Sequence, residues 1–306
     1  MENVIAVILI VAFFVQSAFV IALLLRLRQK QNAGATLKMT ISGITNENAD
    51  ENKTTESIIE GLKNNEFKMY LQFIVNNKTK KIVSAEALSR WEKPENGVVG
   101  PGSYIGHMET TGLISQHDFY MFELACRQLE KWKDTEYKDI SISCNFTRIT
   151  LSEEDCIDKL IAISEKYDFD KSKLAIEITE DAIEKDRENA KENVKRCKEL
   201  GFRIYLDDLG SGYTSLANLC DYPIEVVKID RDILLKASTK RGKDLFSGII
   251  ALAHNLNISV ICEGVETEEQ NNLVSQSECD NIQGWYYSKP LSLEGCEAFI
   301  ESYSKK

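Results

Sequence analysis

The sequence predicts an α/β fold of the closed parallel-barrel class, in which strands and helices alternate along the chain. Helical and strand-like segments alternate from about residue 118 to the C-terminus, and their number suits a TIM (β/α)8 barrel. Polar side chains stand at the end of nearly every predicted strand, where such barrels carry their functional groups. An open, doubly wound sheet is the alternative that fits the same alternation. With 306 residues, 43% of them hydrophobic, the chain can bury a full-sized core.

Residues 1–28 are predicted to form a transmembrane helix that precedes the barrel. The apolar run Val4–Leu25 is interrupted only by Gln16 and Ser17, and at about 1.5 Å per residue it can cross a hydrocarbon core of about 30 Å. Cations follow this run instead of preceding it, which argues against a cleaved signal peptide. By the positive-inside rule we expect a single-pass protein of the cell (inner) membrane, with its N-terminus outside and the remainder cytoplasmic.

Residues 29–55 are predicted to be a flexible cytosolic linker, because they are rich in Asn, Thr and Glu and contain no aromatic side chain. The folded domain then covers residues 56–306. Eight cysteines are scattered through it without a CxxC pair, which predicts reduced core residues of a cytosolic domain. The formal net charge of −11 argues against a nucleic-acid polymer as a partner.

Hydrophobic periodicity predicts the elements of residues 56–306 in turn. A helix that starts near Glu56 is followed by two apolar runs, Met69–Val75 and Ile82–Leu88, which flank the polar turn Asn76–Lys80 and predict a hairpin. The elements predicted after the hairpin are helix Asp118–Lys133, strand Ile140–Phe146, helix Asp155–Tyr167, strand Leu174–Ile178, helix Arg187–Leu200, strand Arg203–Asp207, strand Val226–Ile229, helix Lys243–Leu256, strand Ser259–Cys262, helix Glu268–Ser275, a short strand around Ile282 and helix Leu293–Tyr303.

The polar residues at the strand ends predict a metal site. They are Glu86, Asn145, Glu177, Asp207, Asp208, Lys228, Glu263 and Gln283. Five of these are acidic and one is a lysine, so their formal charges sum to −4, which two divalent cations would neutralise. Oxygen ligands without Cys or His favour Mg²⁺ or Mn²⁺ over zinc.

The stretch from Arg203 to Ser215 carries the strongest local signal. A β-prone run ends on the adjacent carboxylates Asp207 and Asp208 and passes directly into a Gly-Ser-Gly turn. Adjacent carboxylates repel, and a divalent metal is the usual compensation, while a solvated turn is the alternative. Gly210 and Gly212 permit backbone conformations that a side chain would forbid.

Several separated motifs give the chain a family resemblance. They are Tyr70-Leu71-Gln72, Glu86-Ala87-Leu88, Glu109 to Ile114, Cys144 to Thr147, Glu177 to Glu180, Asp207 to Tyr213, Lys228-Ile229-Asp230, Glu263 to Thr267 and Gln283 to Pro290. Through them the chain resembles the EAL domain over roughly Glu56–Tyr303. The EAL family comprises cyclic-di-GMP phosphodiesterases, and the resemblance implies a modified TIM barrel with an antiparallel first strand.

The resemblance also implies roles for individual residues. The implied metal ligands are Glu86, Asn145, Glu177, Asp207, Asp208 and Glu263. Lys228 and Glu263 resemble the pair that positions and deprotonates the attacking water. Substrate contacts are implied for Gln72, Leu88, Arg90 and Gln283. Stabilisation of the loop after Asp208 is implied for Glu180, Gly210, Gly212 and Glu266.

The activity that the resemblance implies is two-metal hydrolysis of cyclic-di-GMP to linear pGpG at the cytosolic membrane face, by a homodimer that uses Mg²⁺ or Mn²⁺. Leu209 stands where the family usually has Phe, which bears on dimerisation and rate. One alternative is a catalytically weak or inactive EAL domain that serves as a cyclic-di-GMP receptor or a protein-interaction module. From the residues alone, a metal-dependent lyase or isomerase with Lys228 as its base is a further alternative.

Overall fold

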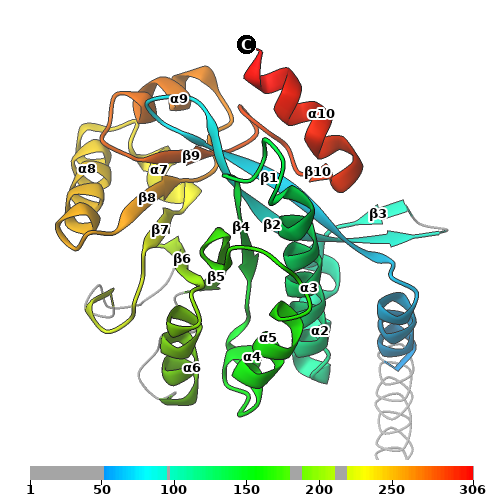
Figure 1. Ribbon diagram of the computed structural model, residues 1–306. Coiled ribbons are helices and arrows are strands. Elements are labelled where there is room, and N and C mark those ends of the chain that lie inside the picture. Colours follow the sequence, from blue (N-terminus) through cyan, green and yellow to red (C-terminus); the bar gives the residue numbers. More distant parts are fainter. Residues whose placement is uncertain (1–51, 95–96, 180–187, 211–218, 306) are drawn as a thin grey trace, which may run out of the picture. The chain divides into compact units, whose positions relative to one another are not determined.

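The structure is a computed structural model that describes residues 52–94, 97–179, 188–210 and 219–305 (Figure 1). The chain divides into two compact units, Met1–Ser57 and Ile58–Lys306. Residues 52–63 are helical and lead into the first strand. Among the described residues, no helix combines the length and the apolar character that crossing a membrane requires. The predicted transmembrane segment Val4–Leu25 lies outside the described residues.

The strands of the second unit form a closed barrel. In the described residues its eight strands are β1 (Phe67–Asn76), β2 (Ile82–Lys93), β4 (Ser141–Asn145), β5 (Leu174–Thr179), β6 (Arg203–Leu209), β7 (Val226–Ile229), β8 (Ser259–Cys262) and β9 (Asn281–Gln283). Neighbouring strands follow the order β1-β9-β8-β7-β6-β5-β4-β2, and the β1–β2 pairing closes the ring, which excludes the open sheet. β1 is antiparallel to both neighbours and the other pairs are parallel, as the resemblance implies.

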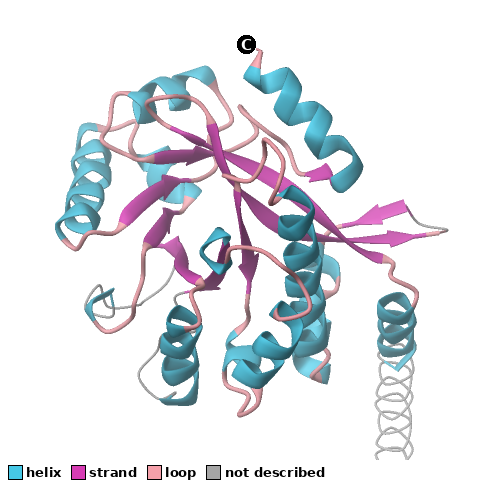
Figure 2. Cartoon of the chain, in the orientation of Figure 1, coloured by secondary structure: helices cyan, strands magenta, loops and turns pink. Residues whose placement is uncertain are grey.

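Helices surround the strands, and two short strands extend the sheet (Figure 2). The short strands are β3 (Gly97–Val99) and β10 (Leu291–Ser292), which pair with β2 and β1. The helices are α2 (Ile105–Thr111), α3 (Ile114–Trp132), α4 (Arg148–Leu151), α5 (Cys156–Ser164), α6 (Glu188–Glu199), α7 (Arg231–Lys236), α8 (Lys240–Asn255), α9 (Glu268–Ser275) and α10 (Leu293–Ser304). α2, α4 and α7 were not predicted, because helices of four to seven residues are too short to show a periodicity.

Most predicted boundaries lie within a few residues of the observed ones, and local chemistry explains them. α9 begins where predicted, because Thr267 and Gln270 form a capping box around its first turn. α3 begins at Ile114, four residues earlier than predicted. Its first turn is mostly polar and shows no helical periodicity, but Ile114 packs into an apolar cluster with Phe67 and Trp91. All eight cysteines are free, and seven are buried; the core prediction is wrong for the exposed Cys220.

The barrel interior consists of an apolar layer below a polar layer. The apolar cluster comprises Ile74, Ala175, Tyr205, Val226 and Ile261. Because side chains alternate along a strand, the residue two positions after four of these points to the same interior face, one layer nearer the carboxyl end. These four residues are Glu177, Asp207, Lys228 and Glu263. The barrel geometry therefore gathers the predicted strand-end residues above one apolar floor.

Candidate active site

A single ammonium group lies at the centre of the polar layer. Lys228 Nζ is 3.1 Å from Glu86 Oε2, 3.2 Å from Asp207 Oδ1 and 2.6 Å from Glu263 Oε1, and it also pairs with Glu177 Oε1. The Lys228 side chain is 1% exposed, so these carboxylates replace its hydration shell. One cation thus faces four carboxylates that come from different strands of the barrel.

The excess of carboxylates perturbs the pKa values in the site. Burial would lower the pKa of Lys228, but the surrounding carboxylates outweigh burial and raise it well above its usual range. Burial raises the pKa of Glu177 well above its usual range, against the attraction of Lys228. Burial likewise raises the pKa of Glu263 to about 8. In the metal-free domain, protons therefore offset the charge that Lys228 cannot neutralise.

Glu86 stays ionised because its carboxylate accepts hydrogen bonds from two side-chain amides. Gln283 Nε2 donates to Glu86 Oε2 at 2.6 Å, and Asn145 Nδ2 donates to Glu86 Oε1 at 3.0 Å. Burial raises the pKa of Glu86, but Lys228 and the hydrogen bonds from Gln283 and Asn145 together lower it below its usual range. Glu86 is therefore the ionised partner that fixes Lys228 on the β2 side of the barrel.

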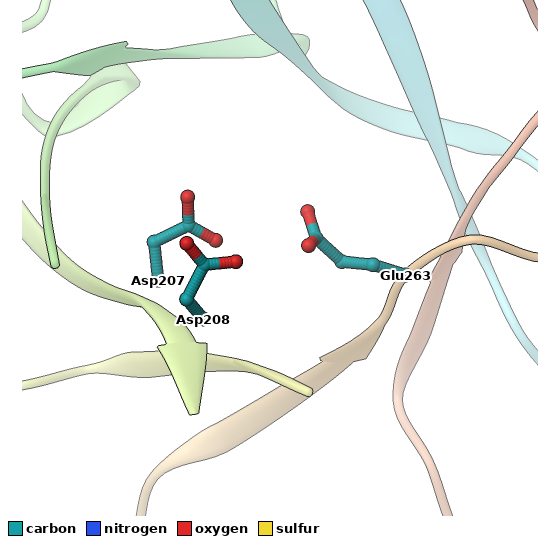
Figure 3. A group of neighbouring side chains, drawn as sticks. All are labelled: Asp207, Asp208 and Glu263. Carbon is teal, nitrogen blue, oxygen red and sulfur yellow. The ribbon is translucent and has the colours of Figure 1, made fainter. Parts of the chain in front are cut away.

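An irregularity in β6 brings Asp207 and Asp208 to the same side. Adjacent residues of a regular strand point to opposite faces. Asp208 has a positive φ of 57°, and the β6–β7 register shifts between Leu206 and Leu209. Figure 3 shows the result, with both carboxylates facing Glu263 across the mouth of the barrel. Gly210 follows with a φ of +99°, and a Cβ there would lie 2.3 Å from Ile233 Cδ1, so this turn requires glycine.

The donor set in the mouth fits a hard divalent cation. Asp207, Asp208 and Glu263 each offer a carboxylate oxygen within 4.8 Å of the others. Glu177 Oε2 is buried and has no hydrogen-bond partner among the described residues, as expected of an oxygen that a cation would satisfy. Oxygen ligands of this kind suit Mg²⁺ or Mn²⁺. Glu86 and Glu177 contact Lys228 in this structure and lie outside the three-carboxylate cluster.

The other predicted site residues lie around this cluster. Gln72 Nε2 donates to the Ser288 carbonyl at 3.1 Å and thereby ties β1 to the segment after β9. Glu266 accepts from Arg231 Nη2 at 2.8 Å. Arg90 Nη1 donates to the Ser89 carbonyl at 2.8 Å.

Four of the predicted residues lie away from the cavity lining or outside the described residues. Leu88 and Arg90 are half-buried on β2 and are not among the described residues that line the cavity. Glu180 and Gly212 lie outside the described residues.

The site opens into a cavity of about 310 Å³. Its lining residues are Gln72, Glu86, Asp207, Lys228, Arg231, Glu263, Gly264, Glu266, Gln283, Gly284 and Trp285. Arg231 and Trp285 were not predicted as site residues. Their positions in the sequence could have indicated them. Arg231 follows the predicted site residue Lys228 by three positions, and Trp285 follows Gln283 by two. Gly264 permits Arg231 to approach, since a Cβ at its φ of +68° would lie 2.5 Å from Arg231 Cγ.

Comparison with known proteins places this site in a family. A model of the EAL domain matches residues 55–290. The chain belongs to the EAL domain family.

Two curated relatives cover most of this EAL domain. The signaling protein YkoW of Bacillus subtilis (strain 168) is 34% identical over 242 residues, which are 79% of this chain and 30% of that protein. The cyclic di-GMP phosphodiesterase NbdA of Pseudomonas aeruginosa is 30% identical over 249 residues, which are 81% of this chain and 32% of that protein. The chain thus spans about a third of the length of these relatives.

Among solved structures, the PaMucR phosphodiesterase in complex with c-di-GMP resembles this EAL domain with a TM-score of 0.75 at 28% identity. The match covers 80% of this chain and 99% of that chain. The same barrel fold therefore extends over almost the entire length of that solved structure.

Neutralising Asp208 is expected to change how the stability of the metal-free EAL domain depends on pH. Burial, reinforced by Asp207, raises the pKa of Asp208 to about 6 from about 3.8. The folded state therefore binds this proton more tightly, and the stabilisation is lost as pH rises from about 4 to 6. Asp208→Asn should gain stability relative to wild type between pH 4 and pH 7, measured by urea unfolding with a chelator.

Magnesium should stabilise the wild type more than Asp208→Asn, because the cation binds the two aspartates of the folded wild type more tightly than the single remaining carboxylate. The wild-type melting temperature should then rise more with millimolar Mg²⁺ than that of Asp208→Asn. An equal difference between the two proteins at pH 4 and pH 7, together with an equal gain from Mg²⁺, would show that Asp208 is an ordinary solvated residue.

Proposed function

We propose that this EAL domain hydrolyses cyclic di-GMP to the linear dinucleotide pGpG with two divalent cations, Mg²⁺ or Mn²⁺. The observation that carries the proposal is the facing arrangement of Asp207 and Asp208 with Glu263 (Figure 3). The Lys228 ammonium pairs with both Asp207 and Glu263. The relative NbdA is a cyclic di-GMP phosphodiesterase, which supports the same activity here.

The cations would be held by carboxylate and amide oxygens of the mouth. The proposed ligands are Glu86, Asn145, Glu177, Asp207, Asp208 and Glu263. When bound, the cations would polarise one phosphodiester and lower the pKa of a water molecule. Because Lys228 neutralises only one of the surrounding carboxylates, the cations would replace the protons that offset the remaining charge in the metal-free domain.

Glu263 is the proposed proton acceptor. Its side chain is 18% exposed, whereas that of Glu177 is fully buried, so Glu263 can meet a water molecule in the cavity. Bound cations would hold Glu263 in its ionised form, in which its carboxylate can accept the proton of that water molecule. Lys228 acts from behind: its ammonium, 2.6 Å from Glu263 Oε1, orients the carboxylate and stays out of the solvent.

Polar groups on the β1 and β9 side of the cavity would orient the dinucleotide. Gln283 Nε2 donates to Glu86 at 2.6 Å and to Gln72 Oε1 at 3.4 Å. Gln283 lines the cavity, and these bonds leave its buried Oε1 without a hydrogen-bond partner among the described residues. Leu88 and Arg90 are proposed contacts at the outer end of β2.

Hydrolysis is tested with the purified full chain and cyclic di-GMP, by following pGpG. Turnover should require Mg²⁺ or Mn²⁺ and stop on chelation. Glu86→Gln should lower the rate by about 100-fold or more, because it removes one charge from the site. Glu297→Gln on α10, remote from the cavity, is the matched control and should keep the wild-type rate. Binding without turnover under both metals would make the chain a receptor instead.

The proposal extends to a membrane anchor at Val4–Leu25, with the EAL domain on the cytoplasmic face, and to a homodimer. The apolar run and the cations that follow it support the anchor. The protein should then stay with membranes in high salt and at alkaline pH, and a reporter fused after Lys306 should behave as cytosolic. Release of the protein at alkaline pH would contradict a spanning helix. Light scattering of the detergent-solubilised chain tests the dimer.

A further inference from the structure

Trp285 lies at the cavity rim with its surface exposed. The chain has three tryptophans, and the other two, Trp91 and Trp132, are 3% and 1% exposed. Trp285 is 58% exposed and lines the same cavity as Glu86 and Glu263. Other apolar side chains such as Val98 and Leu245 are also exposed, but among these exposed residues Trp285 is the one that lines the described cavity, where aromatic side chains commonly contact ligands.

The backbone holds Trp285 in place. Val265 N donates to the Gln283 carbonyl at 3.2 Å, and Tyr286 N donates to the Val265 carbonyl at 3.0 Å. Gly284 lies so close to Val265 that a Cβ there would be 2.0 Å from its carbonyl oxygen. Gln283, which precedes this turn, donates a hydrogen bond from Nε2 to Glu86 Oε2 at 2.6 Å. The ring is therefore carried by a segment whose position relative to the acidic cluster is fixed.

Two cationic side chains lie beside Trp285 or in the wall of the same cavity, although the interior of the cavity is acidic. The Lys289 ammonium lies 5.4 Å from the centroid of the Trp285 ring, within range of a cation–π interaction. Arg231 also lines the cavity, and its guanidinium donates to Glu266 Oε2 at 2.8 Å. An aromatic face beside basic side chains suits a nucleotide, which offers a flat base and a negatively charged phosphate.

We propose that Trp285 is the stacking platform for one purine base of the dinucleotide and so sets the position of the substrate over the acidic cluster. The identity of the ligand rests on the proposed function. A phosphodiester that reaches Asp207 and Glu263 carries its nucleosides outward toward the rim, where Trp285 offers an exposed ring. Stacking tolerates any base, so Trp285 would contribute affinity and position. Selectivity for guanine would come from other groups in the site.

Tryptophan fluorescence tests the stacking directly. Because Trp91 and Trp132 are buried, quenching on addition of cyclic di-GMP reports on Trp285. The full chain is mixed rapidly with cyclic di-GMP and Mg²⁺, and emission is read within the first turnover. We expect quenching in the wild type and none in Trp285→Phe. An unquenched wild type that nevertheless binds the ligand would overturn the proposal.

Kinetics separate stacking from a structural role. Trp285→Ala should raise KM about 10-fold or more while kcat changes less than about 3-fold, and Trp285→Phe should recover most of the loss. Tyr286→Ala is the control, because Tyr286 is exposed beside Trp285 but is not among the described lining residues. An unchanged KM in Trp285→Ala, or an equal defect in Tyr286→Ala, would contradict stacking.

The two proposals can fail separately. Quenching that is lost in Trp285→Phe, in a wild type that shows no turnover, would refute hydrolysis and leave the stacking intact. Turnover with no quenching and an unchanged KM in Trp285→Ala would leave hydrolysis intact and refute the stacking. A wild-type chain that does not bind cyclic di-GMP would refute both.

Discussion

The pairing of one buried ammonium with four carboxylates is the constraint on which this site depends. Lys228 is held at the centre because Glu86, Glu177, Asp207 and Glu263 reach it from separate strands of a closed ring. A buried ion pair needs good geometry to offset its desolvation, and the fixed strand register supplies that geometry. The remaining negative charge is met by protons in the metal-free domain, which leaves the mouth suited to divalent cations.

Much of this architecture could be predicted from residue patterns. Alternating apolar runs and turn residues place the strands, and parallel strands necessarily bring their carboxyl ends to one mouth. Polar residues such as Glu177 and Lys228, each two positions beyond a buried apolar residue, therefore had to lie in the same interior layer. The net charge of −4 at the predicted strand ends indicated hard cations, because buried carboxylates need a partner of opposite charge.

Other features depend on tertiary context that residue patterns do not carry. The left-handed conformation of Asp208 arises from the β6 irregularity, and only this conformation turns both aspartates toward Glu263. The fourfold pairing of Lys228 follows from ring closure and not from any local motif. Cys220 was predicted as a core residue but is exposed, and nothing in the residue pattern indicated that Trp285 lies at the cavity rim.

The most direct test of the central claim is the free energy of unfolding of Lys228→Met in the presence of a chelator. We expect a loss of about 3–5 kcal/mol, because the buried carboxylates lose their common cation. Adding Glu177→Gln should restore part of it by removing one buried charge. Lys198→Met, whose surface pair with Glu225 is 2.7 Å long, should cost less than about 1 kcal/mol. A Lys228→Met domain as stable as wild type would contradict the account.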